Sequence, residues 1–282
     1  MSGTQREKAE RLRALHTGEQ ILVLPNAWDA ISARLYEETG FPAVGTTSAG
    51  LANTLGYPDG QVAPRDEVLF IVQRIARTVQ APVTADIEGG YGVHSIEEVL
   101  KTVQGVLAAG AVGINLEDAA EANALVDIGL QREKIQAIRA LANSVGVPLV
   151  INARTDAFHL GSLDAEMQWE WAVQRANAYR QAGADCLFVP FVTDGPTIAR
   201  LAAAIEGPLN VLAMPGTPPV AELERLGVKR VSVGSGPHRS TLALVRRIAQ
   251  ELREEGVYGS FMAQTIPYPE VNKLLGGASP TV

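Results

Sequence analysis

The sequence predicts an α/β protein of the (β/α)₈ TIM-type barrel class. Three observations predict this fold. The length of 282 residues lies within the range of single α/β barrels. Short β-rich runs alternate repeatedly with amphipathic stretches. Glycine turns at Gly110, Gly183 and Gly227 fit helices that end at a glycine just before the next strand.

Eight strand and helix units can be read in order, which is the number that closes a barrel. A doubly wound open sheet is the competing architecture. It usually has a glycine-rich phosphate turn after its first strand, and here that position reads Leu24-Pro25-Asn26-Ala27, which favours the barrel. The predicted strands are 21–24, 43–47, 82–87, 112–116, 149–153, 185–189, 209–213 and 230–233, with helices over 29–39, 193–205, 219–226 and 237–254 among those between them.

The predicted domains are a catalytic barrel over residues 1–254 and a C-terminal extension over 255–282. The extension runs past the eighth helix and carries Tyr258, Phe261 and Met262. This is too much apolar surface to be left in water. We therefore expect the extension to pack on a neighbouring subunit.

Composition excludes several classes of protein. Hydrophobic residues make up 46% and charged residues 20%, as in a globular chain. The net charge of -7, with both signs interspersed, gives no support to nucleic-acid binding. Cys186 is the only cysteine, residues 1–20 are charged and helical in pattern, and no run approaches the roughly 18 apolar residues of a membrane span. We expect a cytoplasmic protein without a membrane segment.

Polar residues gather where the predicted strands end, and in a barrel the carboxyl ends of the strands carry the chemistry. Three strands end in Asp86-Ile87-Glu88-Gly89-Gly90, in Glu117-Asp118 and in Arg154-Thr155-Asp156, and the loop after the second strand holds Gly56-Tyr57-Pro58-Asp59.

Four or five carboxylates that converge on one barrel mouth repel one another unless a cation lies among them. All of these ligands are oxygen atoms, which suits Mg²⁺, or Mn²⁺, held by few carboxylates and several waters. The alternative interpretation is that these acidic residues only cap helices and solvate loops.

Arg154 ends an apolar strand, where its charge would be buried without an anion, so it is a candidate clamp for a carboxylate or carbonyl. Its alternative is a permanent ion pair with Glu117 or Asp86. The stretch 45–50 offers backbone N–H groups and hydroxyls that could hold a substrate carboxylate. The turn 234–237 is either a phosphate site or a simple glycine turn.

None of the four histidines, His16, His94, His159 and His238, is expected squarely at a strand end beside the carboxylates. Most are expected at the surface, and His238 is the best placed for acid–base work. Cys186 begins an apolar strand and is expected in the core.

Four motifs, with their spacing, resemble the isocitrate lyase and phosphoenolpyruvate mutase superfamily, and the resemblance runs from about Leu22 to Ser240. The segment 24–29, Leu-Pro-Asn-Ala-Trp-Asp, also looks like these proteins. The motifs are Asp86-x-Glu88-Gly89-Gly90-Tyr91-Gly92, Leu116-Glu117-Asp118, Asn152-Ala153-Arg154 and Gly56-Tyr57-Pro58-Asp59.

The resemblance implies a Mg²⁺-dependent barrel that acts on 2-oxo acids or phosphonate analogues through an enolate held on the metal. It also implies that the last helix is exchanged between subunits, usually in a homotetramer, with a homodimer as the other option. Carried over by position, Asp86 would be the direct metal ligand, and Glu88, Glu117 and Asp59 would hold its waters. Arg154 and the backbone of Thr47, Ser48 and Ala49 would hold the substrate. The expected catalytic residues are Arg154, Asp59 and Glu117.

Two departures from the superfamily pattern narrow the reaction. The lyases resemble one another in a Lys-Lys-Cys-Gly-His loop after the fourth strand, whereas residues 118–125 here read Asp-Ala-Ala-Glu-Ala-Asn-Ala-Leu and lack that cysteine. The mutases and hydrolases carry lysine and asparagine or threonine there, which Asn123 matches only in part, and a histidine after the sixth strand, where this chain has Val189-Pro190-Phe191. Glu88 also stands where aspartate is usual.

The sequence therefore predicts a lyase or decarboxylase of a small 2-oxo acid, with a 2-oxo dicarboxylate such as oxaloacetate favoured. The alternatives are a phosphonopyruvate hydrolase or mutase, and a 2-oxo acid binding protein that has lost catalysis.

Overall fold

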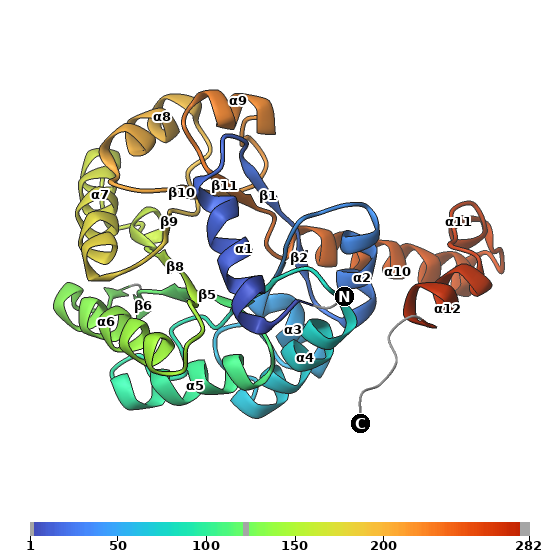
Figure 1. Ribbon diagram of the computed structural model, residues 1–282. Coiled ribbons are helices and arrows are strands. Elements are labelled where there is room, and N and C mark those ends of the chain that lie inside the picture. The colour runs from blue at the N-terminus through green and yellow to red at the C-terminus, as the bar shows by residue number, and fades with distance from the viewer. Residues whose placement is uncertain (1–2, 121–123, 277–282) are drawn as a thin grey trace.

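The computed structural model describes residues 3–120 and 124–276 and shows a closed ring of parallel strands surrounded by helices (Figure 1). The ring closes because the first strand is split at Pro25. Its first half pairs with β11 and its second half pairs with β3. The strands of the ring are β1 (Leu22–Leu24), β2 (Asn26–Ala27), β3 (Val44–Thr46), β4 (Val83–Asp86), β5 (Gly113–Glu117), β8 (Val150–Arg154), β9 (Cys186–Phe188), β10 (Leu209–Leu212) and β11 (Arg230–Ser232).

This ring confirms the predicted barrel, and each of the eight predicted strands overlaps an observed one. The helices that follow the strands form the outer layer. They are α2 (Ala30–Glu38), α3 (Ser48–Leu55), α4 (Arg65–Thr78), α5 (Ile96–Ala108), α6 (Ile128–Ser144), α7 (Ala165–Ala182), α8 (Gly195–Ala204), α9 (Val220–Arg225) and α10 (Gly236–Glu254).

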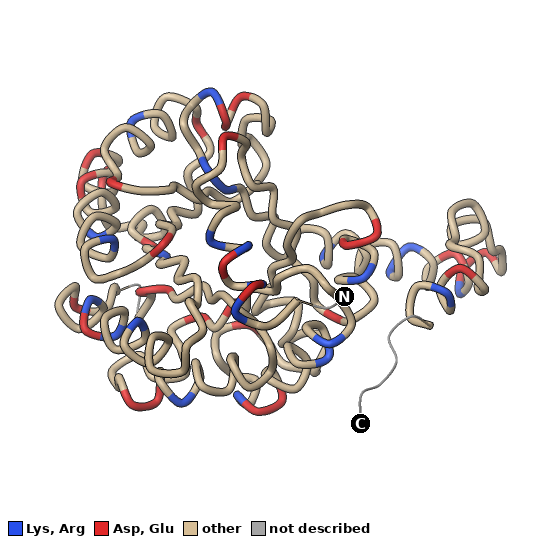
Figure 2. Tube along the Cα trace, in the orientation of Figure 1, with Lys and Arg blue, Asp and Glu red and all other residues tan. Residues whose placement is uncertain are grey.

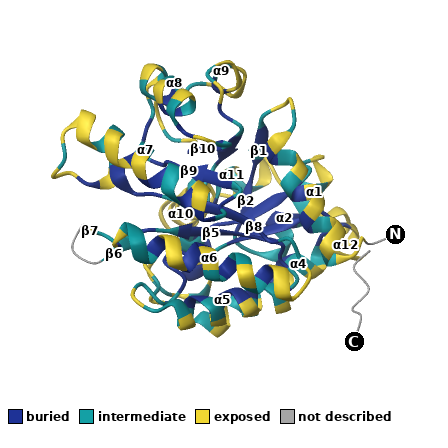
Figure 3. Cartoon of the chain, turned by 60° about the vertical axis from the view of Figure 1, so that its left-hand side comes forward, coloured by how far each residue is buried: buried dark blue, intermediate teal, exposed yellow. Residues whose placement is uncertain are grey.

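Most of the outer helices bury one side against the strands and expose the other, which Figure 3 shows as dark blue strands and yellow outer helix faces. In α10 only His238 is buried. In α4 the buried residues are Val68, Val72 and Ile75, whose spacing of four and three places them on one face. The predicted helix-ending glycines are confirmed, since Gly110, Gly183 and Gly227 have φ values of 93°, 113° and 92°. This left-handed conformation carries no steric cost for glycine.

Four aspartates that are not in the strand-end motifs cap outer helices. Each accepts a hydrogen bond from a backbone N–H in the first turn of its helix, which satisfies a donor that the helix itself leaves free. They are Asp29 on α2, Asp127 on α6, Asp164 on α7 and Asp194 on α8. None of them belongs to the strand-end motifs.

Helix α1 (Gln5–Thr17) lies across the ring of strands and closes one end of the barrel (Figure 1). Its buried residues are Ala9, Leu12 and His16. The first two join the ends of several strands in a separate apolar cluster that includes Leu22 and Val150. The opposite end of the barrel, where the strands have their carboxyl ends, is left for the site.

Beyond the barrel, α10, α11 (Gly259–Met262) and α12 (Tyr268–Gly276) project as an arm (Figure 1). The end of the arm returns to its own barrel: Leu274 is buried, and Nε of Arg34 on α2 donates to the Leu274 carbonyl at 3.0 Å. The rest of the extension keeps large apolar side chains exposed, among them Tyr258, Met262 and Tyr268. Packing on a neighbouring subunit stays a prediction.

Figure 2 shows lysines and arginines interspersed with acidic residues along the outer helices, without a continuous basic stripe in that view. Across residues 3–120 and 124–276, no helix combines the length and the apolar character needed to cross a bilayer.

Candidate active site

A cavity of about 260 Å³ lies at the carboxyl ends of the strands. Five strands contribute to it through their ends or the loops that follow them: β3, β4, β5, β8 and β9. The cavity therefore forms where the sequence placed the polar residues. Its lining is Ser48, Asp59, Gly60, Glu88, Glu117, Ala119, Ala120, Ala124, Leu125, Arg154, Asp156, His159, Leu160 and Phe191.

Arg154 is held between two carboxylates in this cavity. The register of β5 and β8 sets it directly opposite Glu117, whose Oε2 lies 2.9 Å from Nη1. The Asp156 carboxylate accepts two hydrogen bonds from one edge of the guanidinium, from Nε at 2.5 Å and from Nη2 at 2.8 Å. The pairing with Glu117 was one of the expected alternatives. The role of Asp156 was missed, although the residue lies only two positions along the chain.

Asp118, the second acidic residue of the Glu117-Asp118 motif, points away from the cavity and is fully buried. It accepts hydrogen bonds from the Tyr179 hydroxyl at 2.6 Å and from Arg175 at 3.1 Å. Its other oxygen accepts the backbone N–H of Asp156 at 2.9 Å. Asp118 thus fixes the turn that carries Asp156, and through it the orientation of Arg154.

Glu88 accepts a hydrogen bond from the loop after α3, through Gln61, which was not among the predicted site residues. Oε1 of Glu88 accepts the backbone N–H of Gln61 at 3.0 Å, and the Gln61 side chain accepts the N–H of Tyr91 at 2.6 Å. All three residues have left-handed backbones, with φ of 53°, 59° and 59° for Glu88, Gln61 and Tyr91. Such conformations cost free energy and persist only where neighbouring contacts fix them, which occurs most often at functional sites.

Asp86 lies at the end of β4 and faces the start of α3. Its Oδ2 accepts the Ser48 N–H at 3.1 Å, and its own N–H donates to Oγ1 of Thr46 at 2.9 Å. Among the predicted substrate-binding groups, the Thr47 N–H is already bonded to the Ala27 carbonyl at 3.1 Å. The structure therefore does not offer the Thr47 amide to a substrate, and Thr47 and Ala49 are not among the residues that line the cavity.

The carboxylates of the site are destabilised in their charged form. Burial, reinforced by Asp86 and Asp59, raises the pKa of Glu88 to about 7. Burial likewise raises the pKa of Glu117 to about 8, against the favourable charge of Arg154. Burial also raises the pKa of Asp86, with Arg154 and Ser48 acting in the opposite direction. A cation among these groups would remove the conflict.

The donor set fits a hard divalent cation with a water shell. Among the residues that the structure describes, four acidic residues and one arginine line the cavity, and no cysteine does. Among residues 3–120 and 124–276, however, no three His, Cys, Asp or Glu side chains are close enough to ligate one ion together. The expected convergence of the carboxylates is therefore looser than a ready ligand cluster. Mg²⁺ suits such a site, because it commonly keeps several waters and takes only one or two carboxylates directly.

The structure reverses the expected ranking of the histidines. His238 is buried at the start of α10, with its ring 5.1 Å from that of Trp28, and it does not line the cavity. His159 is exposed, as expected of a surface residue, but it lies on the cavity rim in the short helix η2 (Ala157–His159) directly after β8. Cys186 is buried, as expected, and burial raises the pKa of its thiol to about 12.

The loop after β5 forms a small hairpin of β6 (Ala119–Ala120) and β7 (Ala124–Leu125) that covers one side of the cavity. The tip of this loop, residues 121–123, lies outside the described residues, and with it Asn123. The hairpin strands place alanine and leucine side chains on the cavity wall.

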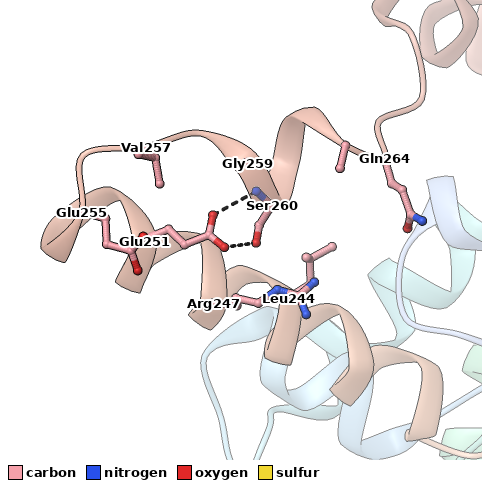
Figure 4. A pocket seen from close by; sticks show the side chains of 9 residues that line it. Leu244, Arg247, Glu251, Glu255, Val257, Gly259, Ser260 and Gln264 are labelled. Atoms are coloured by element: carbon pink, nitrogen blue, oxygen red, sulfur yellow. Dashed lines mark hydrogen bonds between the residues drawn. The ribbon is translucent and has the colours of Figure 1, made fainter.

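A larger hollow of about 530 Å³ lies in the arm, between α10 and α11 (Figure 4). Glu251 reaches across it and accepts the Ser260 N–H at 2.9 Å. The hollow is lined mostly by exposed side chains such as Arg247 and Glu255. It lacks the enclosed pairs of opposite charges that the cavity at the barrel mouth has. The chemistry belongs to the smaller cavity.

Comparison with known proteins shows the family of the chain. The family model described as phosphoenolpyruvate phosphomutase matches residues 12–253. The chain is 36% identical to an uncharacterised protein of Mycobacterium tuberculosis (strain ATCC 25618 / H37Rv), over 93% of this chain and 94% of that protein. It is 33% identical to an oxaloacetate decarboxylase of Bradyrhizobium sp. (strain BTAi1 / ATCC BAA-1182), over 89% of this chain and 85% of that protein.

A solved structure from Burkholderia cenocepacia J2315, described as a lyase/mutase, superposes with a TM-score of 0.88 at 35% identity and covers 98% of this chain and 97% of that one. The family match spans the whole barrel, from α1 to α10, and includes every motif residue of the cavity. The chain belongs to the phosphoenolpyruvate mutase and isocitrate lyase superfamily of enzymes.

Proposed function

We propose that this protein is a divalent-metal-dependent lyase or decarboxylase that acts on a small 2-oxo acid, with a 2-oxo dicarboxylate such as oxaloacetate favoured. The observation that supports this most strongly is the pairing of an acidic cavity with one arginine, Arg154, whose guanidinium faces the same space. The similarity to an oxaloacetate decarboxylase agrees with this choice.

Mg²⁺ is the proposed cofactor, with Mn²⁺ as the other option. Asp86 would be the direct ligand, while Glu88, Glu117 and Asp59 would hold the waters of the ion. When bound, such an ion withdraws electrons from the carbonyl and carboxylate of a 2-oxo acid and lowers the cost of forming an enolate.

Arg154 would hold the substrate and the negative charge that develops on it. Its Nη1 and Nη2 face Glu117 and Asp156, so an incoming carboxylate competes with Glu117 for the guanidinium. Ser48, which opens α3, lines the cavity and presents the positive end of a helix to it. The Ala49 N–H in the same first turn is a further proposed donor, although Ala49 itself does not line the cavity.

The cavity dimensions favour a small substrate with a short distal group. A volume of about 260 Å³ is below the usual range for drug-sized ligands. Part of the cavity wall is apolar, formed by Ala119, Leu125, Leu160 and Phe191 among others. The third carboxylate of a tricarboxylate would lie against this wall, where no described residue pairs with its charge. The carbon dioxide that a decarboxylation releases is apolar and suits such a wall.

Phosphonopyruvate hydrolysis or rearrangement remains a second candidate function, because the family model is described as a phosphomutase. Phe191 stands in the loop after β9, where mutases carry a histidine, so the chain lacks that expected phosphonate partner. A third option is a 2-oxo acid binding protein without turnover.

The test is a substrate panel with purified enzyme and Mg²⁺. Oxaloacetate, 3-methyl-oxaloacetate, 2-methylisocitrate and phosphonopyruvate are followed by carbon dioxide, 2-oxo acid and phosphate release, with an EDTA-treated sample as control. We expect carbon dioxide from the 2-oxo dicarboxylates only, and none after metal removal. Phosphate release would favour the second candidate, and calorimetric binding without turnover the third. Full activity under saturating EDTA would contradict the metal assignment.

We further propose that a second copy of the chain covers the arm, in a homodimer or homotetramer. The exposed Met262 (68%) and Tyr268 (80%) are unusual for a surface that faces water. Sedimentation of the wild type against a variant that ends at residue 256 tests this, and a monomeric wild type would refute it. We also infer a cytoplasmic location, since the chain carries one buried thiol and no disulfide.

A further inference from the structure

The proposed reaction needs a proton donor, and the proposed function assigns the expected catalytic residues, Arg154, Asp59 and Glu117, to other roles. Decarboxylation of a 2-oxo dicarboxylate breaks the C3–C4 bond, releases carbon dioxide and leaves the electron pair in an enolate. The enolate then takes one proton at C3. Arg154 does not release its proton near neutral pH. Asp59, Glu88 and Glu117 are assigned to the waters of the cation, and Asp156 is bound to Arg154.

We propose that His159 is the catalytic proton donor of this site, an inference that rests on the proposed function. Of the four histidines, His159 is the one that lines the cavity. It follows Arg154 by five residues, and its backbone N–H donates to the Asp156 carbonyl at 2.8 Å. The same short turn therefore carries the substrate-binding arginine and the proton donor.

Phe191 fixes the position of the His159 ring. The two ring centroids are 4.7 Å apart with an interplanar angle of 34°. The ring of Phe191 also lies 5.7 Å from the guanidinium carbon of Arg154. Phe191 has a left-handed backbone with φ of 66°, a strained conformation for a bulky residue. One strained aromatic residue thus sets the spacing between His159 and Arg154.

The charged side chains around His159 are mainly acidic. The charged groups that line the same cavity are Arg154, Asp156, Glu117, Glu88 and Asp59. Imidazole exchanges protons near neutral pH, which suits general acid catalysis.

The exposure of His159 completes the cycle. A ring nitrogen of His159 gives its proton to C3 of the enolate and the imidazole becomes neutral. Because the ring is exposed at the rim, it recovers a proton from water before the next turnover. The net reaction consumes one proton, releases carbon dioxide and involves no change of oxidation state that would need another reactant.

Stereochemistry tests this role directly, because a placed donor protonates one face of the enolate and free solvent protonates both. The Mg²⁺-loaded enzyme turns over 3-methyl-oxaloacetate in D₂O, and the product is reduced at once to the 2-hydroxy acid to prevent exchange. The samples are wild type, His159→Ala, His159→Gln and the control His94→Ala, which changes an exposed histidine that does not line the cavity.

We expect a single configuration at C3 from the wild type and the control, and a racemic C3 from both His159 variants. The kcat of the His159 variants should fall by up to about 10²-fold, the lower end of what a general acid contributes. Added imidazole should restore part of the rate of His159→Ala but not the configuration. A single configuration from the His159 variants, or a racemic product from the wild type, would overturn the proposal. A wild type that releases no carbon dioxide from any 2-oxo dicarboxylate would instead refute the proposed function, on which the donor role depends.

Discussion

The two ends of the barrel each hold an arginine, and the two arginines have opposite surroundings. At the carboxyl end, Arg154 contacts Glu117 and Asp156 within an acidic cavity. At the end closed by α1, Arg230 is fully buried, and its hydrogen-bond partners are neutral. One site has an excess of negative charge, and the other encloses a positive charge in amides, a hydroxyl and an imidazole.

Each of the three guanidinium nitrogens of Arg230 has a hydrogen-bond partner. Nε donates to the Ser232 hydroxyl at 3.2 Å, Nη2 donates to Oδ1 of Asn115 at 3.2 Å, and Nη1 lies 3.3 Å from Nε2 of His16. Because an arginine only donates, Nε2 of His16 is the acceptor, and its Nδ1–H then donates to the Leu12 carbonyl at 2.8 Å. His16 is therefore neutral in the folded protein.

The difference teaches how to tell a structural charge from a functional one. Each guanidinium nitrogen of Arg230 bonds a neutral group of its own chain, and the fully buried side chain does not line the cavity, so its network is structural. At the mouth, the carboxylates outnumber the arginine and their charged forms are disfavoured by burial. An excess of buried carboxylates of this kind indicates a site that binds a ligand or cation from outside the chain.

The largest expected effect comes from the mouth. Asp86→Ala should lower kcat/KM by roughly 10³-fold or more, the scale of several kcal/mol of metal assistance, while the fold is kept. Steady-state kinetics, circular dichroism and melting with and without Mg²⁺ measure this. The wild type should gain thermal stability with Mg²⁺, and the variant should not. A variant that keeps both the gain and the activity would show that Asp86 is not the metal ligand.

Arg154→Lys should have the second largest effect. Lysine keeps the charge but loses the two-point contact with Asp156 and the fork offered to a substrate. We expect kcat and kcat/KM to fall by roughly 10²-fold, as for the loss of an oxyanion-hole donor, with little change in melting temperature. Lowered stability with near-normal kcat would mean that Arg154, like Arg230, only balances charge within the chain.

At the end of the barrel closed by α1, His16 should make the stability of the protein depend on pH. Burial, together with the charge of Arg230, lowers the pKa of His16 from 6.5 to about 3. Between these two pH values the unfolded chain binds a proton on His16 more tightly than the folded protein does. The free energy of unfolding is therefore unaffected by protonation of His16 above pH 6.5 and decreases as the pH falls towards 3. By pH 5 the loss is about 2 kcal/mol.

Urea unfolding from pH 7 to pH 5 measures this loss. His16→Gln keeps one donor and one acceptor but does not titrate, so its stability should fall by about 2 kcal/mol less than that of the wild type over the same range. Equal slopes for the two proteins would show that His16 is not the group that responds.

Cys186→Ser should have the smallest effect on activity. The thiol lies in β9 on the buried side of the barrel and outside the cavity lining. We expect kcat to stay within about three-fold of the wild type, because the buried thiol, with its raised pKa, is a poor nucleophile. Complete loss of turnover in a folded Cys186→Ser protein would contradict this.

The sequence predicted the strands well because each is a short apolar run with glycine or proline nearby, and parallel strands inside a barrel are buried on both faces. The hairpin of β6 and β7 was missed, since its described residues, Ala119–Ala120 and Ala124–Leu125, have little strand propensity. Its pairing depends on tertiary contacts.

From the sequence, the candidate site could be predicted only for residues whose place in the barrel follows from the strand that they end or directly follow. Asp86, Glu117 and Arg154 are the last residues of their strands and Glu88 follows two residues after β4, so the barrel topology places them at the same end of the barrel. Gln61, Asp156 and Phe191 depend instead on how loops meet, and nothing in a loop sequence states which other loop it will contact. The positive φ of Phe191 and Gln61 had no signal either, since neither residue is a glycine.

The closure of the ring at Asn26 has a consequence for how the chain folds. Its side chain donates to the Thr46 carbonyl at 2.7 Å and accepts the N–H groups of Val233 and Gly234 at 2.9 Å. The contact with Val233 joins residues 207 positions apart, so it forms only after almost the whole chain has left the ribosome. Contacts of such long sequence separation slow folding. We therefore expect β1 to lack its strand partner in the nascent barrel until β11 has been synthesised.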